Sequence, residues 1–434
     1  MASASAIIPV GYKQTEVGVI PEDWKVRKLG DICKFSTGSG LLKGEIKVSG
    51  KIPAIPYTAL YTDFSEILDY ELIKWFVDDI SLTHVVSEPC VLIASSSNME
   101  LNTGKATALT EHLPVALGRE IIILKTKYDA GYISYLLSSK LYRRRTLKLA
   151  TGTTIKHLYT TTFHDYAIAV PSRSEQIAIT GVLFGADALI ILLKKLIDKK
   201  RAIKTSTMQE LLTGKTRLPG FGGEWKVKSL AEIGEITGAG VDKKIVEGET
   251  SVRLVNYLDV YNRTFIYSNE LKHHVTAPTS KATRCSVRKG DVFFTPTSEV
   301  RDDIAVSAIA MEDILDATYS YHVVRLRIDD DWDLNFRAYA FQTKAFLDQA
   351  AILSDGSGTR YVISLPNFRN IRISFPEKSE QHAIGQILSD MDAEITALEQ
   401  RLEKTKAIKQ GMMQQLLTGR IRLVEPSTPV EASA

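Results

Sequence analysis

The chain has 434 residues, enough for more than one domain, and its 44% hydrophobic and 24% charged residues are ordinary for a soluble globular protein. The formal net charge of +3 is too small to indicate nucleic-acid binding by itself. Three widely separated cysteines, Cys33, Cys90 and Cys285, argue against a disulfide framework or a CxxC metal site. We find no apolar run that approaches membrane-spanning length and no signal peptide, so we expect a cytoplasmic protein with no membrane partner.

The first part of the chain is predicted to form a weakly structured N-terminal segment, residues 1–20, and a globular unit, residues 21–170. A helical stretch, Gly131–Lys148, separates the last two strands of this unit. Short apolar runs bounded by turns predict its strands: Cys90–Ala94, Glu120–Leu124 and Tyr166–Val170.

A long helical stretch follows, and the chain contains it twice. Residues 171–218 and 376–423 align without a gap, and about half of the aligned positions are identical. In both copies the apolar residues alternate in steps of four and three, which keeps them on one helix face. Two unrelated core helices would explain this stripe, but not the shared Ala-Ile-Lys and Leu-Leu-Thr-Gly, so we predict a packed pair of related helices. The predicted seam comprises Ile179, Leu183, Ile190, Leu193, Ile197, Ile384, Leu388, Met391, Ile395, Leu398 and Leu402.

Each copy also carries its own start and stop signals. Ser174 and Ser379 stand just after an X-Pro break, where an N-cap residue is expected. Gly214 and Gly419 follow the last apolar pair, where a glycine can take the left-handed conformation that ends a helix.

A second globular unit lies between the two helices, over residues 219–375, and residues 424–434 are predicted to be a flexible tail. Its helical stretch is Phe336–Leu353, in the same relative place as in the first unit. Its predicted strands are Asp291–Phe294, Tyr321–Ile328 and Ile371–Phe375.

The segments that lead into the two units are also related. Trp24-Lys-Val precedes the first unit's Leu29, and Trp225-Lys-Val precedes Leu230 in the second. The order unit, helix, unit, helix closes on itself if the end of the second helix lies beside Trp24. We therefore predict an α+β fold of two mixed α/β units joined by two long antiparallel helices, with circular organisation and an approximate two-fold axis.

The sequence gives no indication of catalysis. Gly214-Lys215-Thr216 resembles the end of a phosphate-binding loop, but Gln209 stands where that motif needs a glycine, and no GxGxxG, HExxH or GxSxG occurs. The acidic pair Asp302-Asp303 and the pair His273-His274 are more typical of solvated turns than of metal sites. We predict no catalytic residue, no metal site and no cofactor bound by this chain.

Polar loops stand at corresponding places in both units. Ser95–Lys105 and Thr295–Asp303 each follow a buried strand, and Thr151–His157 and Ser354–Tyr361 each precede the last strand. Such loops carry hydroxyl, amide and basic groups that contact base edges and phosphates, and Tyr142–Arg145 adds a basic cluster. Taken singly, each of these segments is better explained as an ordinary surface loop or a solvated helix face, but their repetition at corresponding places in both units favours a function. The candidate DNA-binding residues are Ser97, Asn98, Asn102, Thr103, Lys105, Arg143, Arg144, Thr153, Thr154, Lys156, Ser298, Arg301, Ser357, Thr359 and Arg360.

With this doubled layout, the chain resembles a type I restriction–modification specificity subunit over nearly its whole length. The resemblance rests on the order of units and helices, the Trp24 and Trp225 entries, the Gly-Thr loops and the Leu-Leu-Thr-Gly endings. It also rests on the strand, proline, Ser-Glu-Gln and helix passages at residues 166–183 and 371–388.

The resemblance implies that residues 21–170 and 219–375 are target recognition domains, each reading one half of a bipartite site on double-stranded DNA. The related helices then set the spacer and dock two modification subunits, which bind S-adenosylmethionine and methylate adenine N6. Restriction/translocase subunits, which use ATP and Mg²⁺, join that assembly. This chain would be its non-catalytic specificity subunit. Two alternatives stay open: a coiled-coil scaffold with two protein-binding modules, and the specificity partner of a fused restriction–methylation enzyme.

Overall fold

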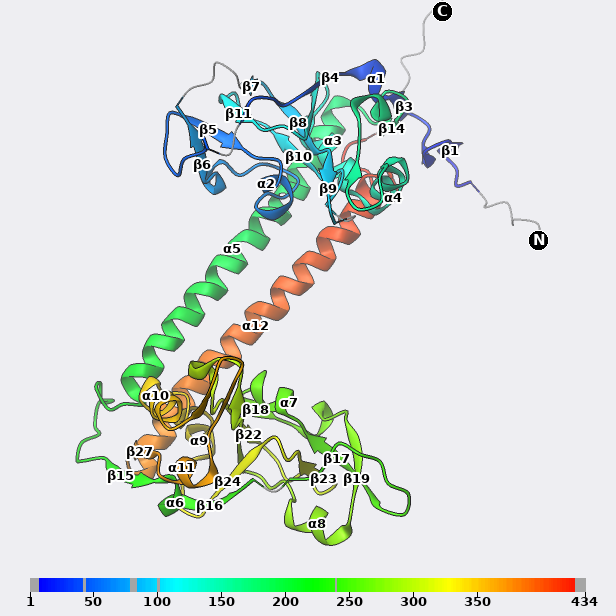
Figure 1. The fold of residues 1–434 in the computed structure, drawn as a ribbon. Helices are drawn as coiled ribbons and strands as arrows, with labels where there is room; N and C mark the ends of the chain where they lie inside the picture. Colours follow the sequence, from blue (N-terminus) through cyan, green and yellow to red (C-terminus); the bar gives the residue numbers. More distant parts are fainter. Residues whose placement is uncertain (1–7, 42–43, 79–83, 100–101, 239, 426–434) are drawn as a thin grey trace, which may run out of the picture. The chain divides into compact units, whose positions relative to one another are not determined.

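The computed structural model describes residues 8–41, 44–78, 84–99, 102–238 and 240–425 (Figure 1). The chain divides into two compact units. Unit 1 contains residues 1–194 and 400–434, and unit 2 contains residues 195–399. Each long helix is therefore shared between the two units, with its first 22 residues in one unit and its last 17 in the other.

Unit 1 contains two four-stranded sheets. The first, in the order β10-β8-β12-β4, is antiparallel throughout, and the second, β6-β5-β11-β7, holds one parallel pair, β5 with β11. The predicted strands at Cys90–Ala94 and Glu120–Leu124 are confirmed as β8 and β12. The bounds are β4 Cys33–Thr37, β5 Ile52–Ile55, β6 Trp75–Val77, β7 His84–Val86, β8 Cys90–Ala94, β10 Ala106–Leu109, β11 Val115–Leu117 and β12 Ile121–Thr126.

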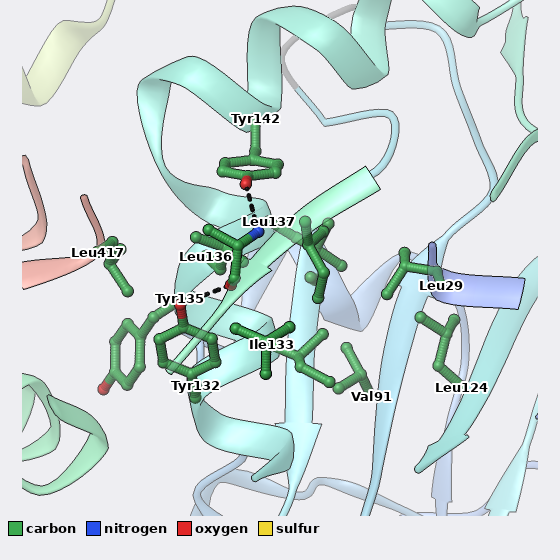
Figure 2. Packing of buried hydrophobic residues seen from close by; sticks show 14 of the residues in the cluster. Leu29, Val91, Leu124, Tyr132, Ile133, Tyr135, Leu136, Leu137, Tyr142 and Leu417 are labelled. Carbon is green, nitrogen blue, oxygen red and sulfur yellow. Dashed lines mark hydrogen bonds between the residues drawn. The ribbon is translucent and has the colours of Figure 1, made fainter. Parts of the chain in front are cut away.

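The single predicted helix is two helices, of which the first packs on β10 and β8. They are α3 (Ala130–Ser138) and α4 (Lys140–Leu149), and the extended backbone of Ser139 breaks the helix between them. The third predicted strand is confirmed as β14 (Ala167–Val170). Figure 2 shows Tyr132 and Tyr142 reaching the same β14 residue: both hydroxyl groups bond to the backbone of Ala169, at 2.9 and 3.0 Å.

The N-terminal segment is more ordered than predicted. Residues 12–21 form a hairpin of β1 (Tyr12–Thr15) and β2 (Gly18–Pro21), and Val17 and Ile20 are buried in the core of unit 1. The prediction of a weakly structured segment is wrong for the described residues 8–20, because contacts with the end of the second long helix hold the hairpin: Tyr12 Oη donates to the carbonyl of Gly419 at 2.8 Å. Of the predicted flexible tail, residues 426–434 lie outside the described residues.

Unit 2 follows the same plan with a five-stranded sheet, β16-β24-β20-β22-β18, and a three-stranded sheet, β19-β17-β23. The predicted strand Tyr321–Ile328 is shorter than expected, because Tyr321 and His322 form a turn before β24. The bounds are β16 Gly234–Thr237, β17 Thr250–Val255, β18 Phe265–Ile266, β19 His274–Ala277, β20 Val292–Phe294, β22 Ser307–Ala310, β23 Ala317–Tyr319 and β24 Val324–Ile328.

The helical stretch of unit 2 is also split, into α9 (Leu334–Ala340) and α10 (Lys344–Ile352), since the side chain of Thr343 caps a new helix. In both units the entry segment pairs with the last strand: β3 (Lys25–Lys28) with β14, and β15 (Lys226–Ser229) with β27, Arg372–Phe375. The short helices are α1 Leu29–Ile32, α2 Ala59–Thr62, α6 Leu230–Ile233, α7 Tyr257–Tyr261, α8 Thr279–Arg284 and α11 Leu365–Arg369.

The two repeated stretches form helices of equal length, α5 (Arg173–Leu211) and α12 (Lys378–Leu416). Both begin before the predicted N-caps, so Ser174 and Ser379 lie inside the first turn instead. In α5, Ser172 takes the capping role, and its Oγ accepts from the Glu175 N–H at 3.3 Å. The predicted terminal glycines are confirmed, because Gly214 and Gly419 both have a φ of 69°.

The helices are antiparallel within each unit. In unit 1, Lys409 near the end of α12 pairs with Asp187 in the first half of α5 at 2.6 Å. In unit 2, Lys204 near the end of α5 pairs with Asp392 in the first half of α12, also at 2.6 Å. The predicted antiparallel arrangement of the two related helices is therefore confirmed.

The predicted seam residues differ in their surroundings. Ile179 and Leu183 lie in the core of unit 1, together with the last turn of α12, and Ile384 and Leu388 lie in the core of unit 2, together with the last turn of α5. The first apolar residues of each long helix are thus part of the core of a globular unit. Of the remaining positions, Met391 and Leu398 are half-buried, and these are buried: Ile190, Leu193, Ile197, Ile395 and Leu402.

Helix α5 is more apolar than the sequence analysis assumed. By length and composition alone it is long and apolar enough to cross a membrane, with a mean hydropathy of 2.1 over one window, so the statement that no run approaches that length is wrong. The reason is that α5 carries apolar residues on two faces. Ile179 and Leu183 are buried in unit 1, whereas Ile177 and Phe184 are exposed.

Candidate DNA-recognition surfaces

In unit 1 a two-stranded pairing brings the two predicted polar loops together. Strand β9 (Ser96–Ser97) pairs with β13 (Lys156–His157), with Ser97 opposite Lys156. One step further, the Leu158 N–H donates to the carbonyl of Ser95 at 2.8 Å. The loop after β8 and the loop before β14 therefore form one surface.

Unit 2 builds the same arrangement from its own pair of loops. Strand β21 (Thr297–Ser298) pairs with β26 (Arg360–Val362), and β25 (Asp355–Ser357) adds a third strand. Here the Ile363 N–H donates to the carbonyl of Pro296 at 2.9 Å, which matches the Leu158 bond of unit 1. The predicted correspondence between the loops of the two units thus has a structural basis.

A serine hydroxyl shapes the tip of the first loop in each unit. Ser97 Oγ accepts from the Met99 N–H at 3.1 Å, and Ser298 Oγ accepts from the Val300 N–H at 3.1 Å. This local side-chain bond closes a tight turn. The residue between donor and acceptor is Asn98 in unit 1 and Glu299 in unit 2, and both are exposed.

Most of the predicted DNA-binding residues reach the surface. Asn102, Lys156 and Ser298 are half-buried. The exposed ones are Asn98, Arg144, Thr153, Thr154, Arg301, Ser357, Thr359 and Arg360.

Four predicted residues of unit 1 are engaged inside the fold instead. Ser97 and Thr103 are buried, and Arg143 Nη1 donates to the carbonyl of Thr103 at 2.7 Å. Lys105 Nζ donates to the carbonyl of Phe64 at 2.6 Å, and burial lowers the pKa of Lys105. Burial likewise lowers the pKa of Arg143. These four therefore do not belong to the candidate interface: Thr103 and Lys105 lie in the half of the loop that turns inward, Ser97 is buried in β9, and Arg143 of α4 holds the inward half.

An aromatic pair that was not predicted from the sequence lies beside each loop surface. Tyr57 precedes α2 and Tyr61 lies within it, just after β5, whereas Tyr257 and Tyr261 begin and end α7, just after β17. The ring centroids lie 6.1 Å apart in unit 1 and 5.8 Å apart in unit 2. The repeated spacing Tyr-x-x-x-Tyr after a strand was the signal that could have revealed them.

In unit 2 this tyrosine pair borders a hollow of about 490 Å³ at the loop surface. Tyr257 Oη donates to the carbonyl of Thr297 at 2.9 Å, and Tyr261 Oη donates to Asp303 at 2.6 Å. The same hollow is lined by Glu299 and Arg360, while the Arg301 guanidinium lies over the ring of Tyr361, 5.0 Å from its centroid. The lining therefore combines flat rings with groups of both charges.

Further basic groups lie near Arg360, one of the residues that line this hollow. His322 has a lowered pKa, first because it is partly buried and then because Lys243 and Arg360 are close. Lys243 is exposed. Within the described part of the chain, no group of three His, Cys, Asp or Glu side chains could hold a metal, and Asp303 is engaged by Tyr261.

Comparisons with known proteins agree with this layout. The family described as "Type I restriction modification DNA specificity domain" matches residues 21–200 and 222–410. The specificity subunit of the type I restriction enzyme MjaVIII from Methanocaldococcus jannaschii is 25% identical, over 93% of this chain and 94% of its own length. The S subunit of a type I restriction–modification system from M. genitalium shares the fold, with a TM-score of 0.55 at 14% identity, over 91% of this chain and 96% of that one.

A second solved chain comes from a structural study of complex assembly and conformational transition of the type I restriction–modification system. It gives a TM-score of 0.54 at 14% identity and covers 93% of this chain and 99% of its own. Two recognition units on a pair of related helices define a DNA specificity protein of restriction–modification systems. The chain belongs to the type I restriction–modification DNA specificity family and is a specificity subunit, the component that recognises a DNA sequence.

Proposed function

We propose that units 1 and 2 each read one half of a bipartite, asymmetric site on double-stranded DNA. The observation that carries this proposal is the pair of matching loop surfaces, built on β9–β13 in unit 1 and on β21–β26 in unit 2. The backbone of these surfaces is alike, but their exposed side chains differ. One scaffold used twice with different side chains suits a protein that recognises two different short sequences.

The charged groups of each surface are assigned to the phosphate backbone. In unit 1 this group is Lys156, and in unit 2 the groups are Arg301 and Arg360. Arg144, on α4, instead lines a hollow with Ser139 and Gln414. Phosphate contacts of this kind position a protein on the duplex and make affinity fall as salt rises. Base edges are then left to the uncharged and acidic groups at the loop tips.

The helices α5 and α12 are assigned two roles. With 39 residues each, they are ~58 Å long at about 1.5 Å per residue, compared with about 34 Å for one turn of B-DNA. A helix pair of this length suits a spacer between two half-sites. The same helices are the proposed docking site for two modification subunits.

An exposed apolar face supports docking on α5. Ile177, Phe184 and Leu192 are 53, 50 and 62% exposed. The equivalent positions of α12 are His382, Ser389 and Ala397, so this apolar face is a property of the first helix alone. Exposed apolar residues gathered on one helix face favour an interface with another protein.

Chemistry is assigned to the partner subunits. We place S-adenosylmethionine binding and adenine-N6 methylation on the modification subunits, and ATP, Mg²⁺, translocation and cleavage on the restriction subunits. The assembly would act in the cytoplasm, where it meets DNA. A scaffold with two protein-binding modules would show no DNA affinity. A specificity partner of a fused enzyme would copurify with that single larger protein.

The test is selection of bound duplexes from a random pool by the full chain assembled with its modification subunits, at several salt concentrations. The proposal predicts two enriched half-sites separated by a fixed number of unselected base pairs. It also predicts affinity that falls steeply with salt. Binding without sequence enrichment, or enrichment of a single uninterrupted site, would contradict two separate readers.

A further inference from the structure

Asn98 and Glu299 occupy equivalent tips of the two loop surfaces. Each follows a serine whose hydroxyl accepts from the backbone N–H two residues further along the chain, at 3.1 Å. Each serine also has a partner on the neighbouring strand: Lys156 for Ser97 and Tyr361 for Ser298. The turn is the same in both units, so the backbone aims both tip residues in the same way relative to their own unit.

The two tip side chains have no partner among the described residues. Among the residues that the structure describes, neither the Asn98 amide nor the Glu299 carboxylate forms a hydrogen bond or an ion pair, although both stand beside polar neighbours. Glu299 lines the hollow of unit 2 next to Thr359 and Arg360, yet Arg360 does not bind it. Each loop surface therefore carries, at its tip, an exposed polar side chain that has no partner in the described part of the chain.

Their hydrogen-bonding capacities differ in a way that matters for DNA. The amide of Asn98 both donates and accepts, whereas a carboxylate such as that of Glu299 only accepts. A carboxylate is repelled by phosphates, so on a DNA-binding surface it needs a base that offers a donor. In the major groove an asparagine matches the N6 and N7 atoms of adenine, and a glutamate accepts from the N4 amino group of cytosine.

We propose that Asn98 reads an adenine in one half-site and that Glu299 reads a cytosine in the other, both in the major groove. This assignment rests on the proposed function, because it assumes that these two surfaces face DNA. It goes further by naming the reading position of each unit and the base class that each accepts. The identical turns set the position, and the one changed side chain sets the base.

A neighbouring carboxylate provides a matched control. Asp302 is exposed and lies in the same loop, three residues beyond Glu299. Replacing either acid by its amide removes one negative charge from the same loop. Only the Glu299 change alters the group at the tip, so a general charge effect and a specific base contact can be separated.

The experiment is selection of bound duplexes from a random pool, by the full chain with its modification subunits, for wild type, Glu299→Gln, Asp302→Asn and Asn98→Asp. Glu299→Gln should turn one cytosine position into adenine, because glutamine pairs with adenine N6 and N7. Discrimination at that position should change by roughly 5- to 150-fold, the range of a good base contact. Asn98→Asp should move one position of the other half-site from adenine toward cytosine.

Asp302→Asn should leave every base preference unchanged. Thermal unfolding of all four proteins checks that the exposed substitutions are tolerated, and the Asn98 and Glu299 variants test the proposal independently of one another. Unchanged preferences in either tip variant that still binds DNA would overturn the assignment for that unit. The same shift in Asp302→Asn would overturn it as a charge effect. A wild type that enriches no sequence would instead contradict the proposed function, and the base assignment with it.

Discussion

Arg217 binds Glu380 through two hydrogen bonds, from Nε to Oε1 and from Nη2 to Oε2, each 2.6 Å long. Arg422 binds Glu175 in the same way, at 2.6 and 2.9 Å. These are equivalent positions of the repeat, and each pair ties the segment after one long helix to the first turn of the other. The carboxylates of Glu380 and Glu175 are almost fully buried. In unit 1, Arg422 also binds Asp23, at 2.9 and 2.7 Å.

Arg217→Met should lower the free energy of unfolding clearly more than the loss of an exposed ion pair does, because it leaves the buried Glu380 carboxylate without its cation. Denaturant unfolding of the full chain measures this change. Arg201→Met is the matched control. Its pair with Glu399 is largely exposed, so its loss should cost about 0–1 kcal/mol.

The double variant Arg217→Met/Glu380→Leu separates charge from packing. It should recover most of the lost stability, since no unpaired buried carboxylate remains. A single variant as stable as the Arg201→Met control would show that the Arg217–Glu380 pair is not a main support of unit 2.

A second charge cluster lies deeper in unit 1. Lys409 Nζ contacts Asp187 and Glu66, each at 2.6 Å, and Tyr135 Oη donates to Asp187 at 2.8 Å. Burial lowers the pKa of Lys409, but Glu66 and Asp187 outweigh it and hold that pKa above its usual value. Burial also raises the pKa of Asp187, although Lys409 acts to lower it. The site therefore stabilises the charged form of the lysine more than the charged form of the aspartate.

The cluster predicts a loss of stability in alkali. A raised lysine pKa contributes stability that is present below about pH 10.4, the usual lysine value, and is lost as pH rises through the folded pKa. The pKa of Tyr135 is also raised, first by burial and second by the negative charge of Asp187. The unfolded chain therefore releases these protons first, and stability should fall above about pH 10.

Tyrosine absorbance and unfolding, followed together between pH 9 and 12, measure this effect. Tyr135 should ionise only when the chain unfolds, and Lys409→Met should weaken the dependence of stability on pH. Ionisation of all tyrosines near pH 10 in a folded chain would contradict the buried cluster.

Much of the fold could be predicted because its strongest patterns are local. The apolar stripe, the terminal glycines and the repeated flanks gave the helices, their pairing and the doubled plan. The hairpin of β1 and β2 was missed because it depends on a distant partner, Gly419, which accepts from Tyr12. The breaks at Ser139 and Thr343 were missed although both residues are good N-caps, because the surrounding apolar pattern continues through them.

The site was predictable as loops but not as individual side chains. Sequence placed the polar loops of both units, since repetition singled them out. It could not tell that Thr103 and Lys105 turn inward, because the groups that engage them, Arg143 and the carbonyl of Phe64, are remote in sequence. The tyrosine pairs were overlooked because two aromatic residues one helical turn apart are usually a core feature.

If each unit reads its own half-site, a substitution in one loop surface should affect recognition of one half-site only. Lys156→Ala should weaken binding or relax base preference in the half read by unit 1, and Arg360→Ala should do so in the other half. Loss of a phosphate contact should also reduce the salt slope of log affinity by about 1. Site selection and salt titration of the full assembly measure both effects.

Lys344→Ala is the control for these two variants. Lys344 is an exposed residue of α10, pairs with Asp348 and lies outside the loop surfaces, so its loss removes equal charge without a predicted contact. If either Lys156→Ala or Arg360→Ala changed the preferences of both half-sites equally, the two units would not read separately.

The central claim, two readers held apart by the helix pair, is tested most directly by lengthening both helices. Four residues inserted after Leu193 and after Leu398 lengthen the pair by ~6 Å at about 1.5 Å per residue, and seven-residue insertions serve as a variant that keeps the heptad register. Selection from a pool with randomised spacers should return the same half-sites, with a spacer longer by about one to three base pairs for four residues, at roughly 3.4 Å per pair. An unchanged spacer in insertion variants that still fold and bind would contradict the account.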